Sequence, residues 1–424
     1  MKLSKIALNT ANAMRPVLTH ILPASFLSRM KARLVEKNTK ELDKVVIQPF
    51  CPEKYANGVN LVGSIKADTG LGQSMRLIAN ILDHSKAQMT INEFFVPPGG
   101  SMTDQTYADR ITEESPYNIN LIHVNASEFT ICYMQMGNKL WDYRYNIGYW
   151  LWELEDFPEE WVANINLVDE IWTPAEFISR TLRKYTDKPV TTIPYCVTAP
   201  TDDKYDRKHF KLPEDKFLFL MMYASGSVME RKNPLGVIEA FKKAFSRDNK
   251  DVGLVIKINE SEQSENDIKY IHSLLDGYDN IYIISQTMTK VEVNSLNKCV
   301  DVYVSLHRAE GFGLVLAEAM LVGTPTIATN WSANTEFMNS EVACMVDYQM
   351  IEIEKDMPPF KKGYRWADAN TDQAADYMKK LYEDPVYYAD IRERAKAYVE
   401  ERLSMKRAVS LIENRLDQIM EETK

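Results

Sequence analysis

Short apolar runs alternate along the chain with polar turns and with longer segments in which apolar residues recur at helical spacing. A continuous apolar run is typical of a strand buried on both faces, and strands that alternate with helices are typical of a parallel sheet. The runs that predict strands cover residues 45–48, 58–63, 90–96, 119–125, 190–197, 217–222, 251–258, 280–284, 300–306 and 326–329. The pattern therefore predicts an α/β fold.

The length of the chain predicts two domains. It has 424 residues, more than the roughly 250–300 at which a single core stops growing. A polar stretch with a proline, residues 200–203, is typical of a domain boundary. We expect a first domain over residues 45–200, a second over 201–399, and two amphipathic helices within residues 387–422.

The N-terminal arm, residues 1–44, differs in charge from the rest of the chain. Its first 37 residues hold seven basic residues and one acidic residue, whereas the whole protein has a net charge of −10. Apolar residues lie between these charges, and Pro16 and Pro23 break them into pieces too short for a secretory signal. A basic and amphipathic segment predicts binding to an anionic membrane surface. A helix packed on the first domain and a partner-binding tail are the alternatives.

Overall composition narrows the class of protein further. The acidic balance argues against a nucleic-acid partner. No run of 18 apolar residues occurs, so no membrane span is predicted. The five cysteines are scattered without a Cys-x-x-Cys pair, which predicts buried thiols in a reducing compartment. We expect a cytoplasmic protein, peripheral at the inner face of the cell membrane.

One stretch, residues 307–325, carries the most specific chemistry. It follows the apolar run 300–306 and reads HRAEGFGLVLAEAMLVGTP, which predicts a glycine turn at Gly311 and Gly313 and a helix from Leu314 to Leu321. Backbone amides at the positive end of a helix dipole form a cradle for a phosphate. Glu318 is the one polar residue between Leu314 and Val322. A buried carboxylate needs a partner, here a basic side chain or ligand hydroxyls.

Two cations precede another predicted helix start. Arg231 and Lys232 come just before Pro234, where a positive dipole end is a poor neighbour for positive side chains unless an anion lies between them. Two solvated surface cations are the alternative.

The first domain offers a second glycine turn, with Gly70 and Gly72 feeding a helix that reaches Leu82. It allows close approach of the backbone to a ligand, or it is a plain tight turn. His123 ends a predicted strand, where ligand sites of α/β proteins gather; a satisfied core histidine is the alternative. Trp152 and Glu153 lie in the most aromatic stretch, which suits either a sugar-binding surface or an ordinary core.

The stretch from Glu310 to Glu318 resembles the retaining glycosyltransferases of family 4, which carry a Glu, seven residues, Glu signature over a glycine-rich turn. The resemblance implies the GT-B fold: two doubly wound Rossmann-like domains facing a cleft, with the C-terminal helix, about residues 400–424, returning to the first domain. It implies that Glu310 faces the donor sugar and Glu318 binds the ribose. It also implies that Gly311, Phe312, Gly313 and Leu314 hold the diphosphate through their backbone.

The resemblance extends to residues outside this stretch. It assigns Lys232 to the diphosphate, but the family's arginine position is Ser227 here, so Arg231 is the proposed substitute. It places Gly70 and Gly72 at the diphosphate, His123 at the donor sugar, Gln286 and Met288 at the base, and Trp152 and Glu153 near the acceptor.

The implied reaction is retaining transfer of a mannose- or glucose-type hexose from a GDP- or UDP-linked donor to a glycan or lipid-linked saccharide, in bacterial cell-surface polysaccharide biosynthesis. No Asp-x-Asp motif occurs, so we expect no metal or other cofactor. A non-catalytic nucleotide-sugar-binding scaffold and a GT-B phosphorylase or synthase are the alternatives.

Overall fold

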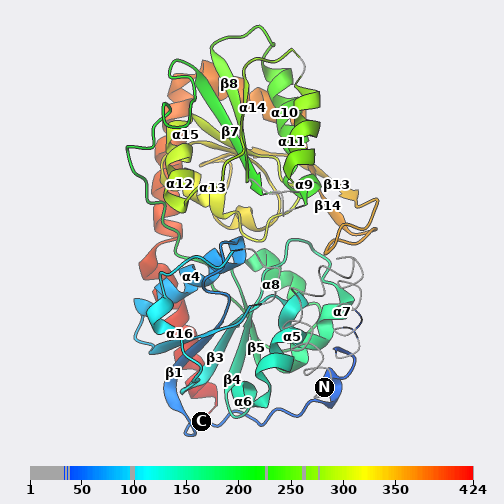
Figure 1. The fold of residues 1–424 in the computed structure, drawn as a ribbon, viewed down its shortest axis with the longest axis vertical. Helices are drawn as coiled ribbons and strands as arrows, with labels where there is room; N and C mark the ends of the chain where they lie inside the picture. Colours follow the sequence, from blue (N-terminus) through cyan, green and yellow to red (C-terminus); the bar gives the residue numbers. More distant parts are fainter. Residues whose placement is uncertain are drawn as a thin grey trace, which may run out of the picture. The chain divides into compact units, whose positions relative to one another are not determined.

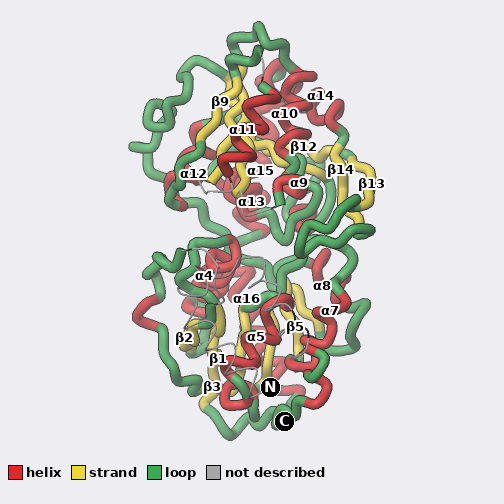
Figure 2. The backbone as a smooth tube through the Cα atoms, turned by 45° about the vertical axis from the view of Figure 1, so that its right-hand side comes forward, coloured by secondary structure: helices red, strands yellow, loops and turns green. Residues whose placement is uncertain are grey.

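The computed structural model describes residues 33, 36, 39–95, 101–224, 228–259, 264–275 and 277–423. The chain divides into two compact units, which Figures 1 and 2 show with their strands and helices. The first unit runs to Trp152, continues over Phe157–Cys196 and takes in the C-terminal segment from Met405. The second unit comprises Glu153–Asp156 and Val197–Ser404. Apart from Arg33 and Glu36, the predicted membrane-binding segment, residues 1–37, lies outside the described residues.

The first unit is built on a parallel sheet of six strands in the order β2-β1-β3-β4-β5-β6. The strands are β1 (Ala56–Gly63), β2 (Met89–Glu93), β3 (Tyr117–His123), β4 (Tyr145–Tyr149), β5 (Glu170–Thr173) and β6 (Val190–Thr192). The helices are η1 (Leu42–Lys44), α4 (Gly70–Asp83), η2 (Ala108–Arg110), α5 (Ala126–Met136), α6 (Asn138–Trp141), α7 (Glu159–Val162), η3 (Ala163–Leu167) and α8 (Glu176–Leu182). The strand order reverses between β1 and β3, and ligands of open α/β sheets bind at such a reversal.

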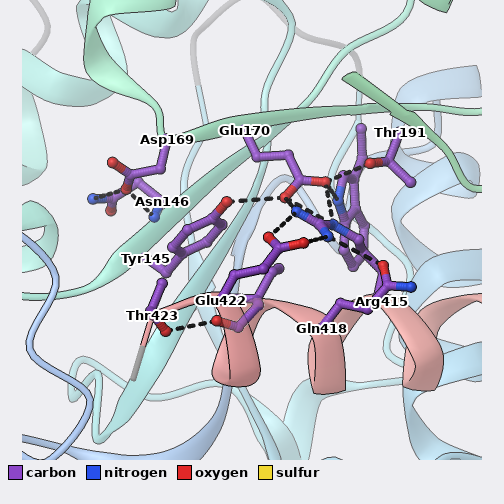
Figure 3. Close-up of polar contacts among 11 residues, drawn as sticks. Tyr145, Asn146, Asp169, Glu170, Thr191, Arg415, Gln418, Glu422 and Thr423 are labelled. Carbon is purple, nitrogen blue, oxygen red and sulfur yellow. Dashed lines mark hydrogen bonds and ion pairs between the residues drawn. The ribbon is translucent and has the colours of Figure 1, made fainter. Parts of the chain in front are cut away.

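The last helix of the chain, α16 (Met405–Glu422), belongs to the first unit, where it packs on α4. Figure 3 shows how a buried ion pair fixes it. Arg415 donates to both carboxylate oxygens of Glu170 on β5, with Nε–Oε1 and Nη2–Oε2 distances of 2.9 Å. Glu170 is fully buried and also accepts from Tyr145, Trp172 and Thr191. The predicted return of the C-terminal helix to the first domain is confirmed.

The second unit repeats the architecture with a sheet in the order β12-β11-β10-β7-β8-β9, parallel throughout. Its strands are β7 (Phe217–Ala224), β8 (Val252–Asn259), β9 (Ile281–Ile284), β10 (Val302–Ser305), β11 (Thr326–Thr329) and β12 (Cys344–Val346), and an antiparallel pair, β13 (Tyr348–Glu352) and β14 (Arg365–Ala369), is added. The helices are α9 (Met229–Lys232), α10 (Pro234–Ala244), α11 (Ser264–Leu274), α12 (Lys290–Cys299), α13 (Leu314–Leu321), η4 (Ala333–Glu336), α14 (Thr371–Glu383) and α15 (Pro385–Arg402). Side chains of the strands pack with α10 and α14 in one apolar core.

Two expectations from the sequence are wrong. Residues 45–48 form no strand, because the backbone of Gln48 bonds instead to the Asp142 carboxylate and to Tyr143. The cysteines are free, but they are not all buried, since Cys51 is exposed and Cys299 is half-buried.

Candidate functional site

The glycine turn between β10 and α13 has the local structure that its sequence predicts. Gly313 is the N-cap of α13 with a φ of 90°, a left-handed conformation that glycine adopts at little cost. None of the described side chains caps the helix, so its first amides point outward as donors. Phe312 is buried against Phe337, with 5.2 Å between ring centroids. Gly311 is buried beside it, and Leu314 is the first residue of the helix, as predicted.

Glu310, just before this turn, lies against the two predicted cations. Lys232 Nζ contacts its Oε1, and Arg231 Nη1 lies 3.6 Å from its Oε2. The Glu310 side chain is 12% exposed. Burial by itself would raise the pKa of this carboxyl, but Lys232 and Arg231 outweigh that effect and lower the pKa to about 2. The anion that the sequence predicts between the two cations is therefore Glu310 in this structure.

The chain positions the two cations through a short helix and a tight turn. Both end α9, and Asn233 follows in the left-handed conformation, with its side chain accepting from Gly236 N at the start of α10. Arg231 is 8% exposed and donates to the Ala309 carbonyl at 2.8 Å. Ser227, the family's arginine position, lies outside the described residues.

One carboxylate oxygen of Glu318 has a partner, and the other has none among the described residues. It is 1% exposed on α13, and its Oε1 contacts Nζ of Lys290, the first residue of α12. Its Oε2 is buried without a hydrogen-bond partner among the described residues. Burial raises the pKa of Glu318, and Lys290 only partly offsets this.

The two predicted base-binding residues precede Lys290 in the loop between β9 and α12. Gln286 is exposed and Met288 is half-buried. Thr289 closes the loop with a capping box, in which its hydroxyl accepts from Glu292 N and the Glu292 carboxylate accepts from Thr289 N. Lys290, which contacts Glu318, thus follows Met288 by two residues in the chain.

In the first unit, Gly70 and Gly72 do not form a turn before the helix as predicted, but lie in the first turn of α4 itself, and Ser74 of the same helix contacts His123. Ser74, in the second turn of α4, lies 2.7 Å from His123 Nε2 and 2.5 Å from the Tyr195 hydroxyl. His123 is 1% exposed, and burial lowers its pKa to about 4, so the imidazole is neutral at pH 7. Its Nδ1 has no hydrogen-bond partner in the described part of the chain.

Gly70 and Gly72 differ in their surroundings. A Cβ on Gly72 would lie 2.1 Å from the Ala67 carbonyl oxygen, so the turn itself requires glycine there. A Cβ on Gly70 would meet nothing within 4 Å. Gly72 therefore allows the loop before α4 to pack against the helix, whereas Gly70 leaves space beside the start of α4.

Trp152 is buried among aromatic rings, 5.0 Å from the Trp161 ring. Glu153 belongs to the second unit, where its charge is one of those acting on Lys232. An acceptor role for either residue stays a prediction.

Sequence reasoning did not single out Lys290, Ser74, Tyr195 or Tyr303. Tyr303 is buried on β10, and the charges of both Glu310 and Glu318 act on its hydroxyl. For Lys290 a signal was present: it directly follows Thr289, the start of a capping-box pattern, and a cation in the first turn of a helix is unfavourable without an anion nearby.

Comparison with known proteins supports a glycosyltransferase. Residues 202–398 match the family model of the glycosyl transferases group 1. No curated protein sequence matches the chain. Among solved structures, Anabaena HepE in complex with UDP and glucose is similar with a TM-score of 0.64, at 12% identity, over 86% of this chain and 100% of that one. Sucrose-phosphate synthase from Thermosynechococcus elongatus gives a TM-score of 0.63, at 12% identity, over 87% and 100% of the two chains.

A glycosyltransferase from Rickettsia africae is also similar, with a TM-score of 0.61 and 14% identity, over 86% of this chain and 99% of that one. The two Rossmann-like units with their parallel sheets have the GT-B fold. The match to the group 1 family model thus lies within the second unit, while the similarity to solved structures shows the fold of the whole chain.

The described residues lack two features. No helix there is long and apolar enough to cross a membrane. That part of the chain also holds no group of three or more His, Cys, Asp or Glu residues arranged to bind a metal ion.

Proposed function

We propose that the protein is a retaining glycosyltransferase that moves a mannose- or glucose-type hexose from a GDP- or UDP-linked donor to a glycan hydroxyl. The observation that carries the proposal is the cluster of Glu310, Lys232 and Arg231 beside the uncapped start of α13. A buried arginine, a half-buried lysine and a helix N-terminus are suited to an anionic leaving group. The similarity to HepE, which was solved with UDP and glucose, supports the same donor class.

Each residue of the cluster has a distinct task in this proposal. The bond from the sugar carbon to the diphosphate oxygen breaks, and negative charge grows on the diphosphate. The oxygen of the acceptor hydroxyl bonds to the same sugar carbon, and its proton leaves with the diphosphate. Lys232, Arg231 and the first amides of α13 stabilise that charge where it develops. Glu318 accepts from the ribose, and Glu310 turns from the cations toward the donor sugar. Gln286 and Met288 border the base.

The residues of the first unit receive supporting roles. Neutral His123, held by Ser74, offers its unpartnered Nδ1 to the donor sugar, and Gly70 allows the diphosphate to approach the start of α4. We assign Trp152 and Glu153 to the acceptor. For the acceptor itself we propose a lipid-linked saccharide at the cytoplasmic face of a bacterial membrane, reached with the help of residues 1–37.

The test begins with calorimetric titration of UDP, GDP and ADP, which identifies the base. The matching nucleotide sugars are then incubated with oligosaccharide acceptors, with and without chelator, and product and anomeric configuration are followed by NMR. Release of nucleotide with a retained anomeric centre is the expected result, in the presence of chelator as in its absence. Binding without turnover on any acceptor would instead identify a scaffold protein, and turnover with inorganic phosphate a phosphorylase.

A further inference from the structure

Lys290 occupies a position that helix energetics alone disfavours. It is the first residue of α12, directly after the N-cap Thr289, where the positive end of the helix dipole repels a cation. Its side chain nevertheless reaches α13 to contact Glu318, while 35% of it stays exposed. Lys290 therefore lies between the loop that joins β9 to α12 and the buried Glu318, and part of its side chain is open to solvent.

The hydrogen bonding of Glu318, the residue that Lys290 contacts, is incomplete. Oε1 of Glu318 is taken by Lys290, whereas the buried Oε2 has no hydrogen-bond partner among the described residues. A buried carboxylate oxygen without a donor is costly. A hydroxyl pair such as that of a ribose is a donor of the right kind for it.

We propose that Lys290 is a positioning residue for the donor nucleotide: by occupying Oε1 of Glu318, it holds the carboxylate as a charged acceptor whose Oε2 takes a ribose hydroxyl. This inference rests on the ribose-binding role of Glu318 in the proposed function and adds to it the residue that makes Glu318 competent. Lys290 touches the acid and not the reacting sugar, so its effect falls on nucleotide binding.

The charges around Glu318 give this role a pH signature. Among the described residues, the groups that face it are Lys290 from α12 and the Tyr303 phenol from β10, while α15 and β11 contribute none. Burial raises the pKa of Glu318 and Lys290 lowers it. Without Lys290 the carboxyl therefore stays protonated to higher pH. A protonated carboxyl is a weaker acceptor, so nucleotide affinity should fall at neutral pH and return as the pH rises.

The experiment measures the affinity of UDP and of 2′-deoxy-UDP by calorimetry between pH 6 and 9, with GDP and 2′-deoxy-GDP as the second pair of probes. The variants are Lys290→Met, Lys290→Gln, Lys290→Arg and Glu318→Gln. The matched control is Lys298→Met, because Lys298 lies on the same helix and pairs with the exposed Asp203. Thermal melting of each variant establishes that it is folded, and Lys290→Gln, which keeps a polar donor, replaces Lys290→Met if the latter does not fold.

We expect Lys290→Met to weaken binding of the ribonucleotide about tenfold or more at pH 7, the loss that accompanies a charged hydrogen bond. Binding should recover toward pH 9, the preference for ribose over deoxyribose should shrink, and Lys290→Arg and Lys298→Met should behave like the wild type. The double variant of Lys290→Met and Glu318→Gln should bind no more weakly than Glu318→Gln alone.

The possible results distinguish failure of the positioning role of Lys290 from failure of the proposed glycosyltransferase function. Wild-type affinity and pH profile in Lys290→Met, together with loss in Glu318→Gln, would overturn the role of Lys290 and leave the ribose assignment standing. Unchanged ribose preference in Glu318→Gln would overturn both. Failure of the wild type to bind either nucleotide would refute the proposed function itself.

Discussion

Replacing Glu310 by glutamine should destabilise the second unit while improving its hold on a diphosphate. The substitution keeps the shape of the side chain and removes the anion that lies against Lys232 and Arg231. Burial alone would raise the pKa of Glu310, yet the two cations lower it from 4.5 to about 2. A difference of that size corresponds to roughly 3 kcal/mol, at the lower end of the 3–5 kcal/mol lost when one partner of a buried ion pair is removed.

The sign of the pH dependence follows from the lowered pKa. Glu310 stabilises the folded state fully above its unfolded-state pKa near 4.5, and this contribution is lost as the pH falls toward 2. At pH 7 the glutamine variant should therefore unfold with about 3 kcal/mol less free energy in urea titrations, and the difference from the wild type should narrow below pH 4.5. Glu239→Gln is the matched control, because that carboxylate is 56% exposed and pairs with Lys243 on the same helix; it should change stability by less than about 1 kcal/mol.

Adding UDP tests whether a diphosphate takes the place of the Glu310 carboxylate beside Lys232 and Arg231. A diphosphate that binds between Lys232 and Arg231 replaces the missing charge, so UDP should raise the melting temperature of Glu310→Gln more than that of the wild type. Its dissociation constant should be lower in the variant, while sugar transfer nearly disappears because Glu310 no longer reaches the donor sugar. A variant as stable as the wild type, or equal stabilisation of both proteins by UDP, would refute the argument that Glu310 and the diphosphate share one pair of cations.

Three further outcomes are expected. Lys232→Met should raise the dissociation constant of UDP far more than that of uridine, and equal losses in calorimetry would place Lys232 away from the phosphates. Arg415→Met should lower the unfolding free energy of the first unit by about 3–5 kcal/mol, because it leaves the fully buried Glu170 without its cation; urea titration followed by tryptophan fluorescence measures this, and a loss under 1 kcal/mol would contradict it. Deleting residues 1–37 should abolish flotation with anionic vesicles and leave UDP affinity unchanged, whereas equal flotation of both forms would count against a membrane-binding arm.

Local chemistry explains which parts of the fold were predictable. The helix from Leu314 to Leu321 and the strand β11 have the predicted bounds, because Gly313 and Gly323 flank the helix and Pro325 directly precedes the strand. The strand predicted at residues 45–48 was wrong because residues distant in the sequence determine the conformation there. An apolar run becomes a strand only when a sheet edge accepts it, and here the backbone of Gln48 is taken by Asp142 and Tyr143, far away in the sequence.

The partners of the site residues could not be predicted in the same way. The sequence predicted an anion beside Arg231 and Lys232 and a partner for Glu318, but it did not indicate which residues these would be. Lys232 and Glu310 are 78 positions apart, and only the order of strands β7 and β10 side by side in the sheet brings their following loops together. Local sequence thus indicates that these charged residues have partners, whereas the topology of the sheet determines which residues the partners are.

The two carboxylates of this turn show how topology decides their chemistry. Glu310 and Glu318 are both almost fully buried, and burial raises the pKa of each. Glu310 faces two cations from α9 and ends with a lowered pKa, whereas Glu318 faces one half-exposed lysine from α12 and ends with a raised pKa. Environments that separate two such groups are characteristic of sites where each has a different task. Glu310 stays charged, which suits a side chain that a diphosphate displaces from the two cations. Glu318, paired with Lys290, is suited to accept hydrogen bonds from ligand hydroxyls.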